Sequence, residues 1–315
     1  MTSRLHNKIG TFRQLEILLA VYERDGISAA SEHLHLTQPT VSMQLKKLSE
    51  AVEMPLYQRA GRKLVFTEAG TALVAAAREI MQSFERADTY LADLRGLKAG
   101  TLRIAVVTTS KYFIPHLLGS FCEIYPQVDI QFRVGNRQQI LERLEQGLDD
   151  LYVFSHLPEQ GEFQASDFLP NPLVAIAPEG HSLAERKSLT LRDLSRLPFL
   201  MREPGSGTRY AIEKHFREKG VPLSVKMTIE SNEAIKHAVM SDLGISILSA
   251  HTLAFGGRAG LTELRVRGLP IRSRWFLVRP GNMTPSLIAQ AFLDHLDRSE
   301  QLNELIEELS PENSS

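Results

Sequence analysis

The stretch LHLTQPTVSMQLKKLSEAV, residues 34–52, decides how the chain begins. Apolar residues recur in it every three or four positions, which predicts an amphipathic helix. Thr37 is the expected N-cap, and Pro39 suits the first turn because the N–H it lacks has no helical partner there. The stripe expected to be buried consists of Val41, Leu45, Leu48 and Val52.

The opposite face of this helix has the residue types that bind DNA. Gln, Thr and Ser near a helix start can hydrogen-bond base edges in the major groove, and lysines further along can contact phosphates. The candidate DNA-contacting residues are Gln38, Pro39, Thr40, Ser42, Met43, Lys46 and Lys47. An ordinary surface helix has the same periodicity, so the flanking segments must decide between the two interpretations.

Those flanking segments favour a DNA-binding unit. Residues 12–25 predict one helix, and the small residues of SAASEHLHL predict a second that packs closely beside it. PLYQRAGRKLVFT, residues 55–67, predicts a basic β-hairpin that turns at Gly61. Its cations, expected to contact phosphates, are Arg59, Arg62 and Lys63. Three helices and a basic hairpin predict a winged helix-turn-helix domain over residues 1–66.

A regular apolar seam follows this domain. Its spacing alternates between four and three residues for about three heptads, which is the a/d pattern of helices that pair. The seam consists of Leu73, Ala77, Ile80, Phe84, Ala87, Leu91 and Leu94. We therefore expect a linker helix within residues 67–100 that dimerises the chain; packing against its own chain is the alternative. A dimer would present two recognition helices to two DNA half-sites.

Composition limits the other possibilities. A chain of 315 residues is long enough for two or three domains, and its net charge of −1 confines any nucleic-acid surface to one region. Residues 1–66 hold nine Lys and Arg against six Asp and Glu, a local net charge of +3. The single cysteine, Cys122, excludes an intramolecular disulfide and a multi-cysteine zinc site, and is expected to fill the core. With no membrane-length apolar run and no signal-peptide pattern, a soluble cytoplasmic protein is expected.

From Thr101 onwards, predicted strands and helices alternate, which is typical of parallel α/β construction. We expect two α/β subdomains, with ligands bound between them at strand ends and helix N-termini. The expected boundaries are 101–310 for the whole domain, about 101–166 and 268–310 for subdomain I, about 167–267 for subdomain II, crossings near 163–169 and 264–271, and a disordered tail over 311–315.

Four turns at expected helix starts have hydroxyl, amide or cationic side chains. Their candidate effector-binding residues are Thr108, Thr109, Ser110 and Lys111; Asn136 and Arg137; Ser206, Thr208 and Arg209; and Ser231 with Asn232. Hydroxyls and free helix N–H groups can hold an anion. One such turn alone would usually be a helix cap. Four at equivalent positions predict a site for a small anion, such as a phosphorylated metabolite, a nucleotide or an oxyanion.

Other functions have less support in the residues. The chain contains no G-x-S-x-G, H-E-x-x-H, P-loop or G-x-G-x-x-G motif, and its ten histidines lack metal-ligand spacing. We therefore assign no catalytic residue, no metal ligand and no cofactor. A solute-binding protein is disfavoured by the winged helix, and a purely architectural DNA binder by the length of the α/β half.

Over nearly its whole length the chain resembles the LysR-type transcriptional regulators. The resemblance rests on FRQLEILLAVYERDGISAASEHLHLTQPTVSMQLKKLSEAVEMPLYQR, LVFTEAG, GTLRIAV, REPGSGTR and DLGISILS. It implies a winged-helix domain, a dimerising linker helix and an effector domain of periplasmic-binding-protein type. It further implies homodimers or homotetramers that bind an interrupted inverted repeat in promoter DNA, act on RNA polymerase and activate transcription when a small molecule binds.

Within that family, the chain is similar to the subgroup that controls Calvin-cycle carbon-fixation genes. The matching segments include TTSKYFIPHLLGSFCEIYP, VGNRQQILERL, LDDLYVF and SNEAIKHAV. A regulator of another pathway, such as sulfur or other oxyanion metabolism, is the alternative. Met43 stands where the family frequently has an arginine, which removes a strong guanine-binding side chain. The family's base preference is therefore not transferred to this chain.

Overall fold

The computed structural model describes residues 11–60, 63–94, 99–186, 188–281, 284–300 and 302. The chain divides into two compact units, residues 1–91 and 92–315, and each is described by itself. The tail expected over 311–315 lies outside the described residues, as does Gly61 at the hairpin turn. Among the described residues, no helix combines the length and apolar character needed to cross a membrane.

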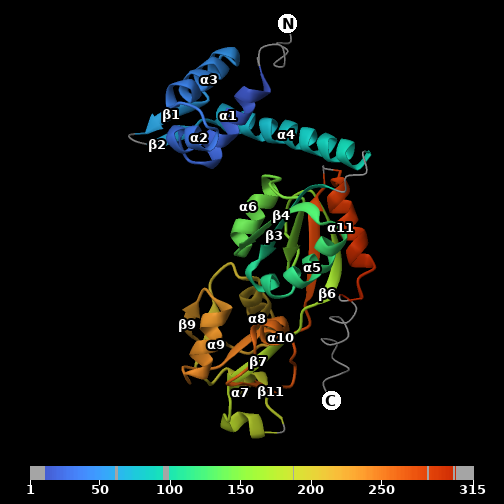
Figure 1. Cartoon of the computed structure of the whole chain (residues 1–315). Coiled ribbons are helices and arrows are strands. Elements are labelled where there is room, and N and C mark those ends of the chain that lie inside the picture. The colour runs from blue at the N-terminus through green and yellow to red at the C-terminus, as the bar shows by residue number, and fades with distance from the viewer. Residues whose placement is uncertain are drawn as a thin grey trace. The chain divides into compact units, whose positions relative to one another are not determined.

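The first unit has the predicted winged helix-turn-helix architecture (Figure 1). Its elements are α1 (Phe12–Glu23), α2 (Ile27–His33), α3 (Gln38–Ala51), β1 (Tyr57–Ala60), β2 (Lys63–Phe66) and α4 (Glu68–Leu94). The antiparallel hairpin β1–β2 pairs Tyr57 with Phe66. Leu18, Val41 and Leu45 are fully buried where the first three helices meet. Burial of this apolar stripe is what holds α3 against the domain.

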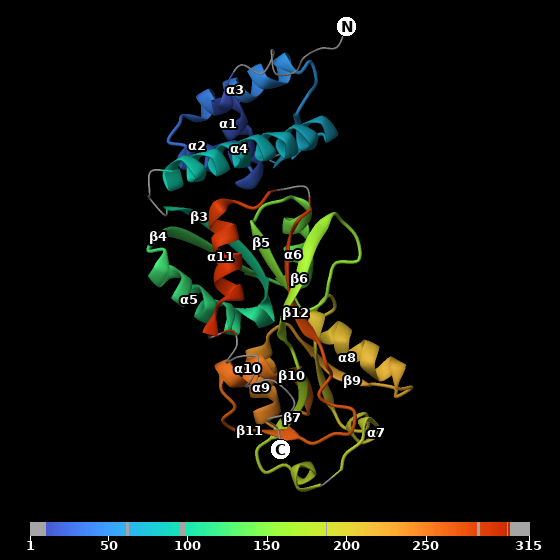
Figure 2. The same ribbon diagram turned by 90° about the vertical axis from the view of Figure 1, so that its right-hand side faces the viewer.

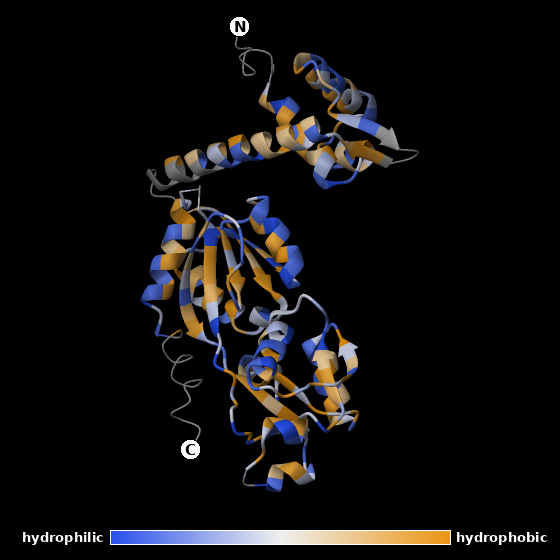
Figure 3. Ribbon diagram, turned by 180° about the vertical axis from the view of Figure 1, so that it is seen from behind, coloured by the Kyte–Doolittle hydropathy of each residue, from blue (hydrophilic) through white to orange (hydrophobic). Residues whose placement is uncertain are grey.

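The apolar seam of α4 divides into two parts. Leu73 and Ala77 are buried in the core of the chain's own N-terminal unit, which corrects their assignment to a dimer seam. The first turns of α4 thus close the winged-helix core. Further along, Ile80, Phe84 and Leu91 are exposed and remain available for dimerisation. Ala87 is also exposed, whereas the side chain of Leu94 lies outside those described. Figure 3 shows hydrophobic residues recurring along the helix.

Subdomain I of the second unit is built on a five-stranded sheet of order β4-β3-β5-β12-β6. The strands are β3 (Ala99–Val107), β4 (Gln127–Gly135), β5 (Leu151–Phe154), β6 (Phe163–Pro170) and β12 (Arg274–Pro280). Strands β4, β3 and β5 are parallel, whereas β12 runs antiparallel to both of its neighbours. Helices α5 (Ile114–Ile124) and α11 (Leu287–Asp297) cover one face, and α6 (Arg137–Glu145) covers the other (Figures 1 and 2). Cys122, expected in the core, is only half-buried on α5.

Subdomain II is centred on β7 (Leu173–Pro178), which pairs antiparallel with β10 (Ser246–Ser249) and β11 (Leu261–Leu264). Next to them, β8 (Phe199–Arg202) and β9 (Val225–Ile229) form a parallel pair, and Phe199 bridges to Ile245. The helices are α7 (Leu191–Leu194), α8 (Gly207–Glu218), α9 (Asn232–Met240) and α10 (Ala250–Gly256), with short 3₁₀ turns η2 (Thr108–Tyr112) in subdomain I and η3 (Ser182–Glu185) here. The sheet of subdomain I is thus mixed, and subdomain II combines an antiparallel sheet with a parallel pair, so the strands are not wholly parallel as expected.

The connections between the subdomains lie a few residues from where they were expected. The segment 163–169 is not a crossing but most of β6, an edge strand of subdomain I. The sequence of this segment does not predict a strand, because many of its residues are polar and exposed. An edge strand needs little apolar surface. The chain crosses instead at residues 171–172 and 271–273, where Asn171 donates its N–H to the carbonyl of Ser273. The two connecting segments therefore lie side by side and form a double hinge.

Candidate DNA-binding helix and effector crevice

Helix α3 begins as its sequence predicts. The hydroxyl of Thr37 accepts a hydrogen bond from the backbone N–H of Thr40 at 3.3 Å, and Pro39 lies in the first turn. Opposite the buried stripe, the side chains of Gln38, Pro39, Met43, Lys46 and Lys47 are exposed, and those of Thr40 and Ser42 are half-buried. The candidate DNA-contacting face is therefore presented to solvent.

The charges on this face are weakly neutralised. Lys46 has an ion pair with Glu50 at 3.8 Å, with both side chains largely exposed, so the pair contributes little. Met43 is 48% exposed, which is unusual for a large apolar side chain and leaves it free to contact a thymine methyl group. The side chains of Arg59, Arg62 and Lys63 in the hairpin lie outside those described. Their contacts with phosphate remain predictions.

The four turns expected to hold the effector all lie where the two subdomains face each other. The most direct contact joins the first turn to the fourth: the Asn232 amide donates a hydrogen bond to the Thr109 hydroxyl at 3.2 Å. Both side chains are buried. We call the region between them, together with the cavity beside it, the crevice. A bond across the crevice makes its closure sensitive to whatever else binds these groups.

Several of the candidate effector-binding residues cap or stabilise their own turns, which was the alternative to binding an anion. Asn136 forms a reciprocal capping box with Gln139, and Ser231 accepts from the N–H of Ala234. Thr108 donates to the carbonyl of Gly135, and the fully buried Ser110 donates to that of Val107. Thr208 is buried in the first turn of α8. These groups shape the turns, and the hydroxyl protons of Thr108 and Ser110 are already donated within the protein.

The cations of the crevice also have partners. Arg137 donates to the carbonyls of His156 and Leu157 at 2.8 and 3.0 Å, so it fixes the loop after β5. Arg209 pairs with Glu213 at 2.7 Å and donates to the carbonyl of Arg202. The ammonium nitrogen of Lys111 lies 5.1 Å from the centre of the Tyr112 ring.

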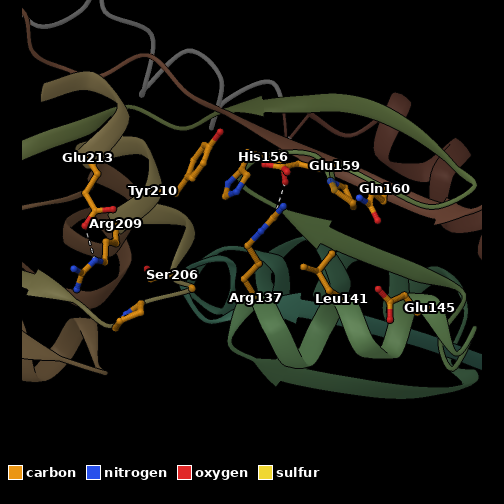
Figure 4. A pocket seen from close by; sticks show the side chains of 13 residues that line it. Arg137, Leu141, Glu145, His156, Glu159, Gln160, Ser206, Arg209, Tyr210 and Glu213 are labelled. Carbon is orange, nitrogen blue, oxygen red and sulfur yellow. Dashed lines mark hydrogen bonds and ion pairs between the residues drawn. The ribbon is translucent and has the colours of Figure 1, made fainter. Parts of the chain in front are cut away.

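A cavity of about 510 Å³ opens beside these groups, with walls from both subdomains (Figure 4). The rings of His156 and Tyr210 stack at 4.4 Å and 11° across it. Burial, reinforced by the charges of Arg137 and Lys214, lowers the pKa of His156 to about 4, so this histidine is neutral at pH 7. The other residues lining the cavity include Leu141, Glu145, Glu159, Gln160, Ser206 and Glu213.

The most buried charges of the crevice were not predicted from the sequence. Arg202, at the end of β8, is 3% exposed and forms an ion pair with Glu203. A second group joins the subdomains: the Tyr112 hydroxyl donates to Glu233 at 2.6 Å, and Glu233 also pairs with the buried Lys236. Burial and the Glu233 carboxylate raise the pKa of Tyr112. The sequence signal that could have identified Arg202 is the adjacent pair of opposite charges, Arg202 and Glu203, just before the Gly-rich turn of REPGSGTR.

Family comparisons agree with this arrangement of domains. Residues 12–71 match the model of the bacterial regulatory helix-turn-helix protein of the lysR family, and residues 95–301 match the LysR substrate binding domain. The chain belongs to the LysR family of bacterial transcriptional regulators. Its two domains are accordingly those of a DNA-binding regulator and not of an enzyme. Among the described residues there is no cluster of His, Cys, Asp and Glu able to hold a metal ion.

Individual relatives narrow the subgroup. The chain is 46% identical over 290 residues to the HTH-type transcriptional activator CmpR of Synechocystis, covering 92% of this chain and 95% of CmpR. It is 42% identical over 287 residues to a RuBisCO operon transcriptional regulator of Acidithiobacillus ferrooxidans, covering 91% and 93%. The Synechocystis CcmR regulatory domain, solved in complex with 2-PG, is 43% identical with a TM-score of 0.60, covering 62% of this chain and 95% of that one. These similarities place the chain close to regulators of carbon-fixation genes.

Proposed function

We propose that this protein controls carbon-fixation genes and that its effector is a small phosphorylated carboxylate such as 2-phosphoglycolate. The observation that carries the proposal is the buried Arg202 next to a hydrogen bond that crosses the crevice from Asn232 to Thr109. An arginine in that position suits a phosphate or carboxylate group. The relatives CmpR and CcmR support the pathway and the ligand class. A regulator of oxyanion metabolism is the second candidate.

The mechanism we propose is a shift between subdomain arrangements. An effector that contacts both sides of the crevice binds the closed arrangement better, and it can shift the equilibrium only by that difference in affinity. Closure would change the arrangement of DNA-binding domains within a homodimer or homotetramer, and with it the bending of the promoter DNA. Contact with RNA polymerase would follow from the altered geometry.

The ligand class is tested by thermal unfolding of the whole chain with a panel of anions. 2-Phosphoglycolate at a hundred times its Kd should stabilise the protein by about 2.7 kcal/mol, and ribulose bisphosphate is a second phosphorylated candidate. Sulfate and nitrate at equal concentration should have little effect. Stabilisation by sulfate or nitrate alone would favour the oxyanion pathway. Absence of any shift would contradict an anionic effector.

The DNA-binding face is tested by the double variant Lys46→Gln/Lys47→Gln. Removing two phosphate contacts should reduce the steepness of log K against log salt by about 1.8 for each recognition helix bound, and weaken duplex binding at least about tenfold at physiological salt. Arg217→Gln/Lys219→Gln, on exposed positions in and just after α8, removes the same charge and serves as the control. An unchanged slope in the α3 variant would contradict the assignment of this face.

A further inference from the structure

Arg202 has an internal carboxylate in the position where an anionic ligand would bind. Its Nε donates to Oε2 of Glu203 at 2.7 Å and its Nη2 to Oε1 at 2.9 Å, a bidentate pair. The arginine side chain is 3% exposed and the glutamate side chain 12%. Two parallel N–H···O bonds are also the geometry with which arginine binds a free carboxylate or phosphate. Glu203 thus has the chemistry of a bound effector's anionic group.

The same guanidinium is linked to the opposite subdomain. Its Nη1 donates to Oδ1 of Asn232, whose amide nitrogen donates to Thr109. A change of partner at Arg202 therefore reaches the hydrogen bond that crosses the crevice. These bonds use three of the five N–H donors that a guanidinium has.

Glu203 directly precedes a glycine turn on the wall of the cavity. It is followed directly by Pro204, Gly205 and Ser206, all of which line the cavity beside the crevice. Gly205 has a φ of +86°, a left-handed conformation that glycine adopts without strain. The Ser206 N–H closes the turn on the carbonyl of Glu203 at 3.2 Å. The residue that pairs with the buried arginine is therefore joined directly to a glycine turn on the cavity wall.

We propose that Glu203 occupies Arg202 in the unliganded protein and that the effector's anionic group replaces it. This inference rests on the proposed function and specifies how the site is regulated. Two like charges within a few ångströms disfavour each other, so a phosphate cannot share Arg202 with an ionised Glu203 at low cost. The exchange makes Glu203 a built-in competitor, which sets the effector concentration at which the regulator responds.

The ionic balance of the crevice supports exchange rather than simple addition. Arg202 is matched by Glu203, and Lys236 by Glu233, so each buried cation already has its own carboxylate. A ligand anion placed on Arg202 would meet the Glu203 carboxylate there unless that carboxylate moved away. Glu203 directly precedes the turn Pro204–Ser206 that lines the cavity, whereas Glu233 is also bound by Tyr112.

The test compares effector affinity in Glu203→Gln and the wild-type chain by isothermal titration with 2-phosphoglycolate and with inorganic phosphate. The amide keeps the shape of the side chain and removes its charge, so affinity for either anion should rise about tenfold or more. Glu203→Asp keeps the competing charge and should stay near the wild-type value. Glu185→Gln, on an exposed turn of subdomain II, controls for the overall charge.

Each outcome decides a different point. A gain in Glu203→Gln that is absent in the two other variants supports the exchange. Measurable wild-type binding that is equal or weaker in Glu203→Gln overturns it and makes the ion pair purely structural. Failure of both the wild type and Glu203→Gln to bind any phosphorylated anion contradicts the proposed effector class, and the exchange with it. DNA binding by the same samples shows that each variant is folded.

Discussion

Replacing Arg143 with alanine is expected to destabilise the effector-binding unit by about 3–5 kcal/mol, because it leaves a buried carboxylate without its cation. Asp149 has a side chain that is 1% exposed, and Arg143 donates to both of its oxygens at 2.7 Å. The Tyr152 hydroxyl completes the arrangement: it accepts from the N–H of Asp149 and donates to the carbonyl of Arg143. These bonds fix the connection from α6 to β5.

The effect is measured by denaturant unfolding, as the change in the free energy of unfolding of the effector-binding unit. Arg133→Ala, which removes an exposed arginine from β4, should change the free energy of unfolding by less than about 0.5 kcal/mol. The double variant Arg143→Ala/Asp149→Ala should be less destabilised than the two single changes added together, because it removes both charges at once. An Arg143→Ala protein as stable as Arg133→Ala would contradict the role given to this pair.

The features that were predicted correctly depend on local sequence. Helix α3 follows from Thr37, Pro39 and the stripe through Val41 and Leu45, all of which act within one helix. The four turns of the crevice likewise coincide with helix starts, two of which are capped by their own side chains, Asn136 and Ser231. Local hydrogen bonding and side-chain periodicity are properties of the segment and need no knowledge of its partners.

The features that were missed depend on tertiary neighbours. Half of the residues of strand β6 are exposed and only Leu169 is buried, so its pairing with β12 is what makes it a strand. Leu73 and Ala77 fit an a/d seam equally well whether the partner is another chain or the winged-helix core. Arg202 looks like a surface charge until the fold places Glu203 and Asn232 around it. Periodicity shows that a face is buried, but not which surface buries it.

The sequence predicted that polar and cationic groups meet in the crevice, but not which cations are buried there. Thr109 and Asn232 do meet, as four converging turns implied. Arg137 and Arg209, however, have their donors turned to carbonyls and to Glu213, and the buried cations of the site are Arg202 and Lys236. The candidate effector residues therefore divide into groups that shape the turns and groups that join the subdomains.

Acid should destabilise the effector-binding unit by about 3 kcal/mol between pH 6.5 and pH 4 through one histidine at the hinge. His251 is fully buried, and burial lowers its pKa to about 4. Its Nε2 donates to the carbonyl of Pro170 at 2.8 Å, while no described residue pairs with its Nδ1. Phe113 and Trp275 lie against the ring, so a proton on Nδ1 would have no acceptor.

The direction of the effect follows from proton binding in the two states. Above pH 6.5 the histidine is neutral in both folded and unfolded chains, and it adds no pH dependence. Between pH 6.5 and 4 the unfolded chain binds a proton at His251 that the folded chain does not, so stability falls as pH falls. Below pH 4 both states are protonated and the loss is complete.

The measurement is the free energy of unfolding of the effector-binding unit at pH 7 and pH 4.5 for the wild type and His251→Gln. The variant should be less stable at pH 7, because glutamine packs poorly among these rings, yet it should lose less stability on acidification. His237→Gln, on the exposed side of α9, controls for the loss of a histidine as such. His156, whose pKa is also lowered, titrates in both proteins and cancels in the difference. An equal acid loss in His251→Gln and wild type would show that His251 is not held neutral by its burial at the hinge.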